Sequence, residues 1–328
     1  MLLPTVAEGF VPALLTRVDR SAYDVLTPDG PARVDAVPAP RDPLDAPTVG
    51  DHLVLSQDRT VLEVLPRRSL LARGTARGTS VGQPLAANVD HVLLCLGLSG
   101  PLPLRRLERL LTLAWESGAT PVVVLTKADL CADLDAAVRE VEPYAPGCAV
   151  VTVSAATGDV AALSPYASSV LVLLGASGAG KSTVVNALLG GEVMATGDTR
   201  DVDGKGRHTT THRELLVLPT GGVIIDTPGL RGVALHAADE GLSLAFSDVE
   251  DLASACRFAD CRHVSEPGCA VLASVEAGDL GQDRVDSWRK LQRELAFQAR
   301  RTDARLQAEE SRKWRTISKA QRARGGRP

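Results

Sequence analysis

The chain has 328 residues, of which 45% are hydrophobic and 3% aromatic, so it can bury a largely aliphatic core in two or three domains. No stretch of the sequence approaches the roughly 18–20 consecutive apolar residues of a membrane span. The first ten residues also lack the basic-then-apolar pattern of a secretory signal. We therefore expect a cytoplasmic protein without a membrane partner.

The net charge of −4 conceals a strong asymmetry along the chain. From Arg284 to the C-terminus there are 14 Lys and Arg against 5 Asp and Glu, a net charge of +9, so residues 1–283 carry −13. A basic end on an acidic body favours an anionic partner, with nucleic acid first. A merely solvated helix and tail would explain this composition equally well.

The first 82 residues contain short stretches of alternating apolar and polar residues, such as 51–56 and 60–65, separated by turn signals. Alternation with period two predicts strands, and short strands joined by turns predict a small antiparallel β-barrel. The stretch 66–78 is basic and punctuated by glycines, which is typical of a connector.

From about residue 84 the apolar residues come in unbroken runs, typical of fully buried strands. A helix is expected over 102–118, where leucines recur every three or four residues. Strands that alternate with helices predict an α/β fold, a parallel sheet wrapped by helices. The expected strands are 91–98, 120–125, 148–154, 169–175 and 221–226.

Beyond about residue 234 the sequence predicts a mainly α-helical region. A cysteine-containing segment comes first, and a long polar helix is expected over 283–307. We expect the basic tail that follows to be disordered when free.

The sequence GASGAGKS, Gly175–Ser182, matches the phosphate-binding pattern G-x-x-x-x-G-K-[ST] between an expected strand and an expected helix. Its glycines allow a tight turn whose backbone N–H groups point at phosphates, and the helix N-terminus adds positive charge. Lys181 is expected to reach the β- and γ-phosphates and to act in catalysis, and the Ser182 hydroxyl to bind Mg²⁺. The residues expected to contact the nucleotide here are Gly175, Ser177, Gly178, Ala179, Gly180, Lys181, Ser182 and Thr183.

The sequence DTPG, Asp226 to Gly229, follows the expected strand 221–226. A carboxylate at a strand end can contact the groups that bind Mg²⁺ without binding the ion itself, and the Gly229 N–H can sense the γ-phosphate. The pattern D-x-x-G is common by itself, and its position after a phosphate loop is what makes it informative.

The sequence TKAD, Thr126 to Asp129, follows another expected strand. The Asp129 carboxylate can accept hydrogen bonds from N1–H and N2–H₂ of guanine, whereas adenine offers neither donor. Lys127 can lay its aliphatic stem over the base, and Ser154 with Ala155 can offer a backbone N–H to guanine O6. The alternative for TKAD is a helix start capped by its Asp or Thr.

These elements are those of a GTPase in an unusual order. An ordinary GTPase has the phosphate loop first and the base-reading elements last, whereas TKAD and Ser154-Ala155 precede the phosphate loop here. If the N- and C-termini of an ordinary GTPase are joined and the chain is opened at another point, the same sheet can still form, because the termini of compact domains often lie close together. The sequence therefore predicts a circularly permuted GTPase.

The polar, glycine-containing segment 204–215 lies where a loop that orders around GTP is expected. Thr210 is our choice for sensing the γ-phosphate and binding Mg²⁺, with Thr209 and Thr211 as close alternatives. Many GTPases place a water-orienting glutamine after D-x-x-G, but this chain has Leu230 there. We therefore predict that His208 acts in catalysis instead.

Four soft metal ligands fall within fourteen residues of the C-terminal region, in the pattern C-x₄-C-x-H-x₅-C. All four can bind Zn²⁺ tetrahedrally, which would leave no open position and would make the site structural. Reduced cysteines near a surface histidine are the alternative. The predicted ligands of one zinc per chain are Cys256, Cys261, His263 and Cys269.

With these motifs in their order, the chain resembles the ribosome-small-subunit-dependent GTPases, the RsgA family. The resemblance implies an N-terminal OB-fold, a central P-loop GTPase domain and a zinc-binding C-terminal domain. The implied division is 1–82 for the OB-fold, 83–234 for the permuted GTPase, 235–310 for the zinc-binding and helical domain, and 311–328 for a basic flexible tail. The stretches that carry the resemblance are 83–90, 126–129, 153–158, 175–183, 206–212, 226–230 and 256–271.

The resemblance also implies a function. A member of this family is a GTP hydrolase stimulated by the small (30S) ribosomal subunit, acts late in that subunit's maturation and binds its 16S rRNA. The expected cofactors are Mg²⁺ with GTP and one structural zinc, and we expect a monomer. Two alternatives are a permuted GTPase of large-subunit assembly and an RNA-binding scaffold that holds nucleotide without turnover.

Two departures from the family pattern affect these expectations. Thr126 stands where many GTPases have asparagine, which would weaken the link between the base-reading and phosphate loops. The N-terminal region has few aromatic residues for base stacking, so we expect arginines to contact RNA phosphates there in a salt-dependent way. The arginines in question are Arg67, Arg68, Arg73 and Arg77.

Overall fold

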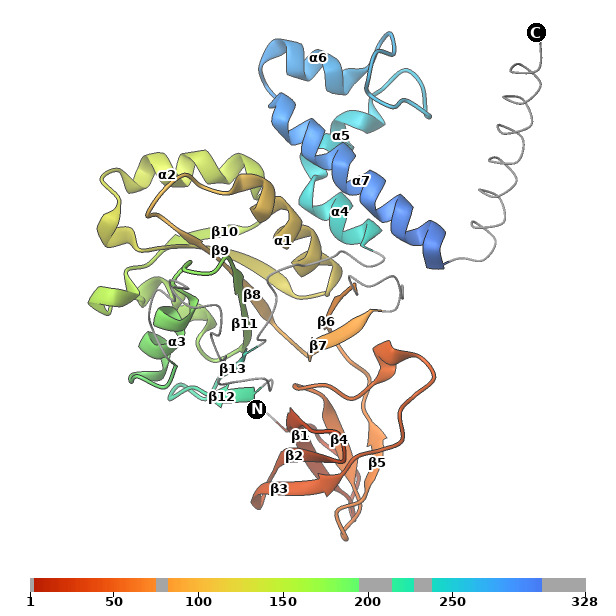
Figure 1. Cartoon of the computed structure of the whole chain (residues 1–328), viewed down its shortest axis with the longest axis vertical. Coiled ribbons are helices and arrows are strands. Elements are labelled where there is room, and N and C mark those ends of the chain that lie inside the picture. Colours follow the sequence, from red (N-terminus) through yellow and green to blue (C-terminus); the bar gives the residue numbers. More distant parts are fainter. Residues whose placement is uncertain (1–2, 75–81, 195–213, 227–237, 303–328) are drawn as a thin grey trace, which may run out of the picture.

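The structure is a computed structural model that describes residues 3–74, 82–194, 214–226 and 238–302. These residues form an N-terminal antiparallel sheet, a central six-stranded sheet with helices, and a group of C-terminal helices (Figure 1). Within these ranges no helix is both long and apolar enough to cross a membrane. Outside them fall the predictions for Arg77, His208, Thr209, Thr210, Thr211, Gly229, Leu230 and the tail 311–328.

Five short strands form the N-terminal sheet in the spatial order β3-β2-β1-β4-β5, and all neighbouring pairs are antiparallel. In β4 the side chains of Leu53 and Leu55 are buried while those of His52 and Val54 are only partly so, which is the alternation of a sheet with one face in the core. The predicted antiparallel β structure is confirmed. The strands are β1 (Val11–Val18), β2 (Ala22–Thr27), β3 (Gly30–Asp35), β4 (His52–Leu55) and β5 (Val61–Val64).

A further pair of strands follows, in which β6 (Leu70–Arg73) lies antiparallel to β7 (Gln83–Ala87). The prediction of a plain connector over 66–78 is therefore wrong for the segment that contains β6. Leu71 is fully buried in the main core. Burial of this apolar side chain outweighs the basic, glycine-containing composition on which the prediction rested.

Arg67 also departs from its expected role as an RNA contact. Its Nε donates to Asp51 Oδ1 at 2.7 Å and its Nη2 to Asp51 Oδ2 at 2.8 Å, and the Asp51 side chain is fully buried. Nη2 also donates to the carbonyl of Ala46 at 2.8 Å. Arg67 is thus engaged inside the fold, whereas Arg68 pairs with Asp90 at the surface, with 63% of its side chain exposed.

The central sheet has the strand order β10-β9-β8-β11-β13-β12. All neighbouring strands are parallel except β12, which runs antiparallel to β13 at one edge. Parallel strands place their carboxyl ends at one edge of the sheet, where ligands of such folds bind. The strands are β8 (His91–Gly97), β9 (Thr120–Thr126), β10 (Ala149–Thr152), β11 (Val170–Gly175), β12 (Glu214–Val217) and β13 (Val223–Asp226).

All five predicted strands of this sheet are confirmed in position, with one correction in burial. Strand β10 is not fully buried, because it lies at the edge of the sheet and Ala149 is exposed. Strand β12 was not predicted. Its four residues are too few to show a period, and Val217 is 53% exposed.

Helices cover both faces of the central sheet, as the α/β pattern predicts. Leu107 and Leu111 of α1 (Leu104–Glu116) pack in one core with Leu94 of β8, and α2 (Leu134–Val141) lies on that same side. On the opposite face, Val184 and Val185 of α3 (Lys181–Leu189) pack in a second core. Helix α3 ends at Gly190, whose φ of 72° is the left-handed conformation that glycine favours.

The C-terminal helices stand against the outer side of α1 (Figure 1). Helices α4 and α1 approach each other closely at Gly241 of α4. A Cβ atom added to this glycine would lie only 2.3 Å from the carbonyl oxygen of Thr112 in α1. The predicted polar helix is present as α7, which is described as far as Thr302. These helices are α4 (Asp239–Ala245), α5 (Ser247–Ser254), α6 (Ala270–Ala277) and α7 (Gln282–Thr302).

Arg284 of α7 joins this group to α1 through a buried ion pair with Glu108, and it also pairs with Asp248 of α5. Its Nη1 donates to Glu108 Oε1 at 2.9 Å and its Nε to Asp248 Oδ2 at 2.6 Å. The side chain of Arg284 is 3% exposed and that of Glu108 is fully buried. Burial raises the pKa of Glu108, and hydrogen bonding and the positive charge of Arg284 oppose that rise.

Arg284→Leu should lower the free energy of unfolding by about 3–5 kcal/mol, because it leaves the Glu108 carboxyl buried without its cation. The matched control is Arg105→Leu, since Arg105 pairs with Asp283 where both side chains are more than two thirds exposed, and such pairs contribute less than about 1 kcal/mol. Chemical denaturation of both variants tests this. Equal losses of unfolding free energy in the two variants would show that the buried pair of Arg284 and Glu108 stabilises the contact of α7 with α1 no more than an exposed pair does.

Candidate nucleotide site and metal cluster

The phosphate loop has the backbone geometry that its glycines allow. An added Cβ at Gly175 would lie 2.5 Å from the carbonyl oxygen of Cys95 on the neighbouring strand. Gly178 and Gly180 have φ values of 76° and 79°, in the left-handed region. Helix α3 begins immediately afterwards at Lys181, so its N-terminal N–H groups face the loop.

The side chains predicted for the phosphates and Mg²⁺ are close together. Lys181 Nζ donates to the carbonyls of Gly175 at 3.1 Å and Ala176 at 2.7 Å, so the loop curls around the ammonium group. Lys181, Ser182 and Asp226 line one small cavity of about 50 Å³. The end of β13 therefore brings the predicted carboxylate beside the phosphate loop, from a position distant in sequence.

Thr126 links the base-reading segment to the phosphate loop. Its buried Oγ1 donates to the carbonyl of Ala179 at 2.8 Å and lies 3.3 Å from the carbonyl oxygen of Leu96. An added Cβ at Gly180 would lie 3.2 Å from Thr126 Oγ1. The threonine thus forms the link between the two loops even though it replaces the usual asparagine.

Asp129, whose carboxylate is predicted to bind guanine, is held in place by Ser154, which was also predicted to contact the base. Asp129 Oδ1 accepts a hydrogen bond from Ser154 Oγ at 2.6 Å. Ser154 is 6% exposed, whereas Asp129 is exposed and can meet a ligand. Ala155 begins the turn after Ser154, where its N–H is the predicted donor to O6.

Lys127 adopts a left-handed backbone conformation, with φ of 59°. Its side chain runs past Gly97, where an added Cβ would lie 3.6 Å from Lys127 Cδ, and its Nζ donates to Ser99 Oγ at 3.3 Å. The sequence reasoning missed this support from the end of β8. A short 3₁₀ turn does begin at Ala128, but no side chain caps it, which argues against the simple capped-helix reading of TKAD.

Asp129→Asn should lower the affinity for GDP at least about 100-fold, because two hydrogen bonds to a charged acceptor are lost. Affinity for xanthosine diphosphate should rise, since xanthine carries a carbonyl at C2 that an amide N–H₂ can donate to. Titration calorimetry with both nucleotides measures this. Asp133→Asn is the control, because Asp133 caps α2 through the Ala136 N–H and asparagine can do the same. Unchanged GDP affinity in the Asp129 variant would contradict the assignment.

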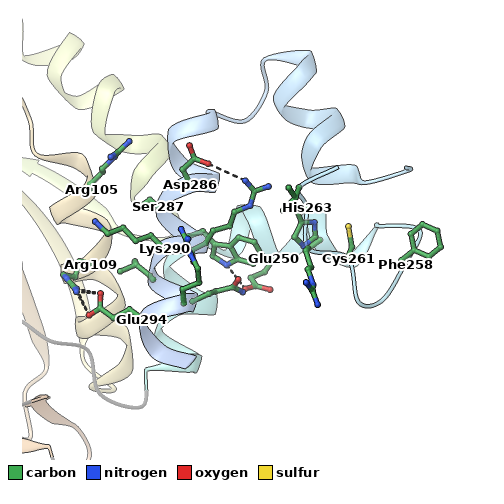
Figure 2. Close-up of a pocket in the computed structure, with 18 of the residues that line it drawn as sticks. Arg105, Arg109, Glu250, Phe258, Cys261, His263, Asp286, Ser287, Lys290 and Glu294 are labelled. Atoms are coloured by element: carbon green, nitrogen blue, oxygen red, sulfur yellow. Dashed lines mark hydrogen bonds and ion pairs between the residues drawn. The ribbon is translucent and has the colours of Figure 1, made fainter. Parts of the chain in front are cut away.

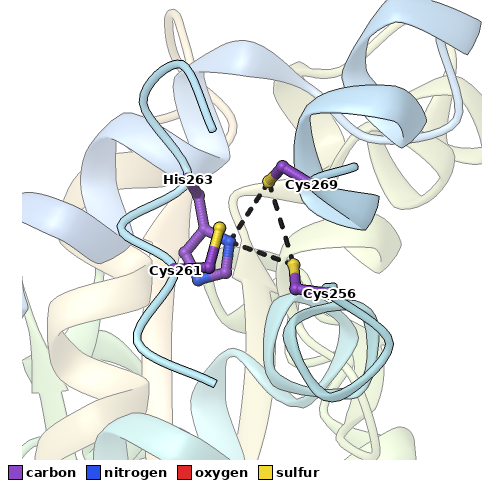
Figure 3. A group of neighbouring side chains, drawn as sticks. All are labelled: Cys256, Cys261, His263 and Cys269. Atoms are coloured by element: carbon purple, nitrogen blue, oxygen red, sulfur yellow. Dashed lines mark hydrogen bonds between the residues drawn. The ribbon is translucent and has the colours of Figure 1, made fainter. Parts of the chain in front are cut away.

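The four predicted metal ligands converge in the C-terminal group (Figure 3), with ligand atoms all within 4.8 Å of one another. Cys256 Sγ lies 3.8 Å from Cys269 Sγ, and His263 Nδ1 lies 3.5 and 3.4 Å from these sulfurs. A tetrahedron with metal–sulfur bonds of about 2.3 Å has edges of about 3.8 Å between sulfurs. The donor set and its spacing therefore fit a tetrahedral metal ion.

The surroundings of the cluster favour its metal-binding form. Burial lowers the pKa of His263, and the positive charge of Arg289 lowers it further, which favours the neutral imidazole that binds a metal. The ring of His263 packs against that of Trp288 at 5.4 Å. Backbone N–H groups of Ala270 and Leu272 point at the sulfurs of Cys256 and Cys269, at 3.3 and 3.4 Å. Trp288 was not predicted to take part, although its place on the apolar side of α7 could have suggested it.

Comparison with known proteins agrees with this arrangement. The RsgA GTPase family profile matches residues 64–236. A small ribosomal subunit biogenesis GTPase RsgA of Streptomyces avermitilis is 52% identical over 95% of this chain and 87% of its own length. The protein of the same name from Opitutus terrae is 49% identical over 80% of this chain and 72% of its own length.

Solved structures have the same fold. The crystal structure of YjeQ from Thermotoga maritima has a TM-score of 0.65 and 27% identity, covering 88% of this chain and 99% of that one. YloQ, described as a circularly permuted GTPase, has a TM-score of 0.63, with 89% of this chain and 98% of that chain covered, and at 23% identity it supports the fold alone. The order of the motifs along this chain and the order of the strands in its central sheet fit that permutation. From its fold, its motifs and its relatives, the chain belongs to the RsgA GTPase family.

Proposed function

We propose that this GTPase hydrolyses GTP to GDP and phosphate on the small ribosomal subunit, as a factor in late maturation of that subunit. The observation that carries the proposal is the convergence of the nucleotide motifs at one edge of the central sheet, where Asp129, Lys181 and Asp226 follow three different strands. The relative from Streptomyces avermitilis is named a small ribosomal subunit biogenesis GTPase.

In this proposal the chain's own residues bind and orient GTP. Asp129 accepts from guanine N1–H and N2–H₂, Lys127 lies along the base, and the loop from Gly175 holds the phosphates with Lys181. Ser182 and Thr210 are the proposed ligands of Mg²⁺, which supplies positive charge to the β- and γ-phosphate oxygens. The remaining proposed nucleotide contacts are Thr126, Ser154, Ala155, Ser177, Gly178, Ala179, Gly180, Thr183, Asp226 and Gly229.

The water molecule needs a positioning group that Leu230 cannot provide, because a leucine side chain has no hydrogen-bonding atom. We assign that role to His208, whose imidazole can accept a proton from water or orient it.

We further propose that the metal of the Cys₃His cluster is zinc, one per chain, since three thiolates and an imidazole form a closed tetrahedral site of the structural kind. The N-terminal antiparallel sheet is proposed to be an OB-fold spanning residues 1–82. The permuted GTPase domain then spans 83–234, the zinc-binding and helical domain 235–310, and a basic flexible tail 311–328. A cytoplasmic monomer that contacts 16S rRNA completes the proposal.

Phosphate release measured with and without purified ribosomal subunits tests the function. Stimulation by 30S particles is expected, with no such effect of 50S particles. Stimulation by 50S alone would assign the chain to large-subunit assembly instead. If the protein binds nucleotide but releases no phosphate alone, with 30S or with 50S particles, it is a nucleotide-holding scaffold and the proposed function is wrong.

A further inference from the structure

A large groove lies between α1, α7 and the metal-binding loop (Figure 2). Its volume is about 1110 Å³. Arg105 and Arg109 line it from α1, residues 258, 259 and 261–264 from the loop that carries the metal ligands, and residues 286–294 from α7. None of the predicted nucleotide-binding residues lines this groove, and its wall includes two of the predicted metal ligands, Cys261 and His263.

The groove is basic, and its acidic residues already have partners. Glu294 pairs with Arg109, Glu250 accepts from Trp288 Nε1 at 3.1 Å, and Asp286 accepts from Gln282 Nε2 at 2.9 Å. Six of the lining residues are cations, against these three acids. The cations are Arg105, Arg109, Arg262, Arg289, Lys290 and Arg293.

Several of these cations have donors to spare. Arg289 Nε and Nη2 are buried and have no hydrogen-bond partner in the described part of the chain, and its Nη1 is 3.5 Å from Asp286. The exposed side chains of Arg262 and Lys290 have no acidic partner among the described residues. Buried guanidinium donors are costly to leave unpaired, so the groove favours an anionic ligand with oxygen acceptors.

Beside these cations the metal-binding loop presents an exposed aromatic ring. Phe258 lines the groove at its outer end (Figure 2) and is 41% exposed. The Arg257 guanidinium lies over the ring, 5.4 Å from its centroid. Binding of backbone phosphates alone would require no exposed ring, whereas an unpaired base can stack on one.

We propose that this groove binds an unpaired stretch of RNA, with one base stacked on Phe258 and the backbone phosphates met by Arg262, Arg289 and Lys290. The proposal rests on the proposed ribosomal function and adds the form of RNA that is recognised. A duplex keeps its bases stacked inside, so its faces are not available to Phe258. An acidic peptide would satisfy the cations but would leave the aromatic ring without a role.

The test uses the full-length protein and two fluorescent RNA 12-mers of one mixed sequence, one intact and one with abasic positions at its centre. Phe258→Leu should weaken binding of the intact strand about 5- to 100-fold, since stacking on an aromatic ring accounts for that much per base. It should leave binding of the abasic strand nearly unchanged. Phe297→Leu is the matched control, because Phe297 is another exposed phenylalanine, 55% exposed on α7, that does not line the groove.

A salt titration separates the phosphate contacts from the stacking. Lys290→Gln should reduce the slope of log affinity against log salt by about 0.7, the value for one phosphate contact on a single strand, whereas Phe258→Leu should leave the slope unchanged. Equal losses for Phe258→Leu on intact and abasic strands, tighter binding of a duplex of the same sequence, or competition by an acidic peptide but not by RNA would each overturn the proposal. GTPase stimulation by 30S particles distinguishes these failures from failure of the proposed function, because stimulation can persist when groove binding is absent.

Discussion

Lys181→Ala should reduce GTP affinity by at least about 100-fold and abolish measurable turnover, since in the proposed site the ammonium group makes charge-assisted contacts with the phosphates. In the structure, Lys181 Nζ donates to the carbonyls of Gly175 and Ala176. These oxygens therefore hold the ammonium group over the loop, where phosphate oxygens can become its acceptors. Calorimetry with a non-hydrolysable GTP analogue measures the affinity, and phosphate release measures the turnover.

Lys290→Ala is the control for the removal of one positive charge, because Lys290 lies on α7 in a different part of the molecule. It should leave nucleotide affinity unchanged. Far-UV circular dichroism of the Lys181 variant should match that of the wild type, since the hydrogen bonds from the ammonium group to Gly175 and Ala176 lie within its own loop. Retained affinity in a folded Lys181→Ala protein would show that the loop is not the phosphate site.

The central sheet and its motifs could be predicted because local sequence determines them. The run 169–175 is apolar throughout and becomes β11, and the glycines after it supply the left-handed conformations of Gly178 and Gly180. The four metal ligands likewise lie within one short segment, so their spacing indicated a cluster that the structure brings together. Burial of β10 was predicted wrongly because edge position depends on which strands pair, and a single strand's sequence does not report that.

Contacts between distant segments could not be predicted in the same way. Arg284 and Glu108 are separated by 176 residues and form a buried pair, yet each looks locally like an ordinary charge on a helix. Arg67 was expected to face RNA because its segment is basic, but the buried carboxylate of Asp51 pairs with it. In both cases the partner decides the role of the arginine, and the partner is known only from the fold.

Cys269→Ser should reduce the metal content from about one ion per chain to well below that, and should unfold the segment between α5 and α6. Structural zinc sites contribute about 10 kcal/mol or more to folding, and a serine hydroxyl is a poor replacement for a thiolate. The loss should appear as a separate early transition in thermal unfolding, because the loop 256–269 is held mainly by the cluster. Elemental analysis and calorimetry of the same sample measure both effects.

Cys131→Ser is the matched control, since Cys131 lies outside the cluster and its thiol donates to the carbonyl of Asp133 at 3.4 Å, which a serine hydroxyl can also do. It should keep its metal and its unfolding profile. GTP affinity should be unchanged in the Cys269 variant, because the nucleotide site is built on the central sheet and not on the C-terminal helices. Burial lowers the pKa of His263, so the folded protein takes up a proton at this ring less readily than the unfolded chain does, and the stability that depends on the neutral ring should be lost as pH falls below the ordinary histidine value of about 6.5. A Cys269→Ser protein that keeps one tightly bound ion, or a wild-type protein that folds fully without metal, would show that the four side chains do not form a structural metal site.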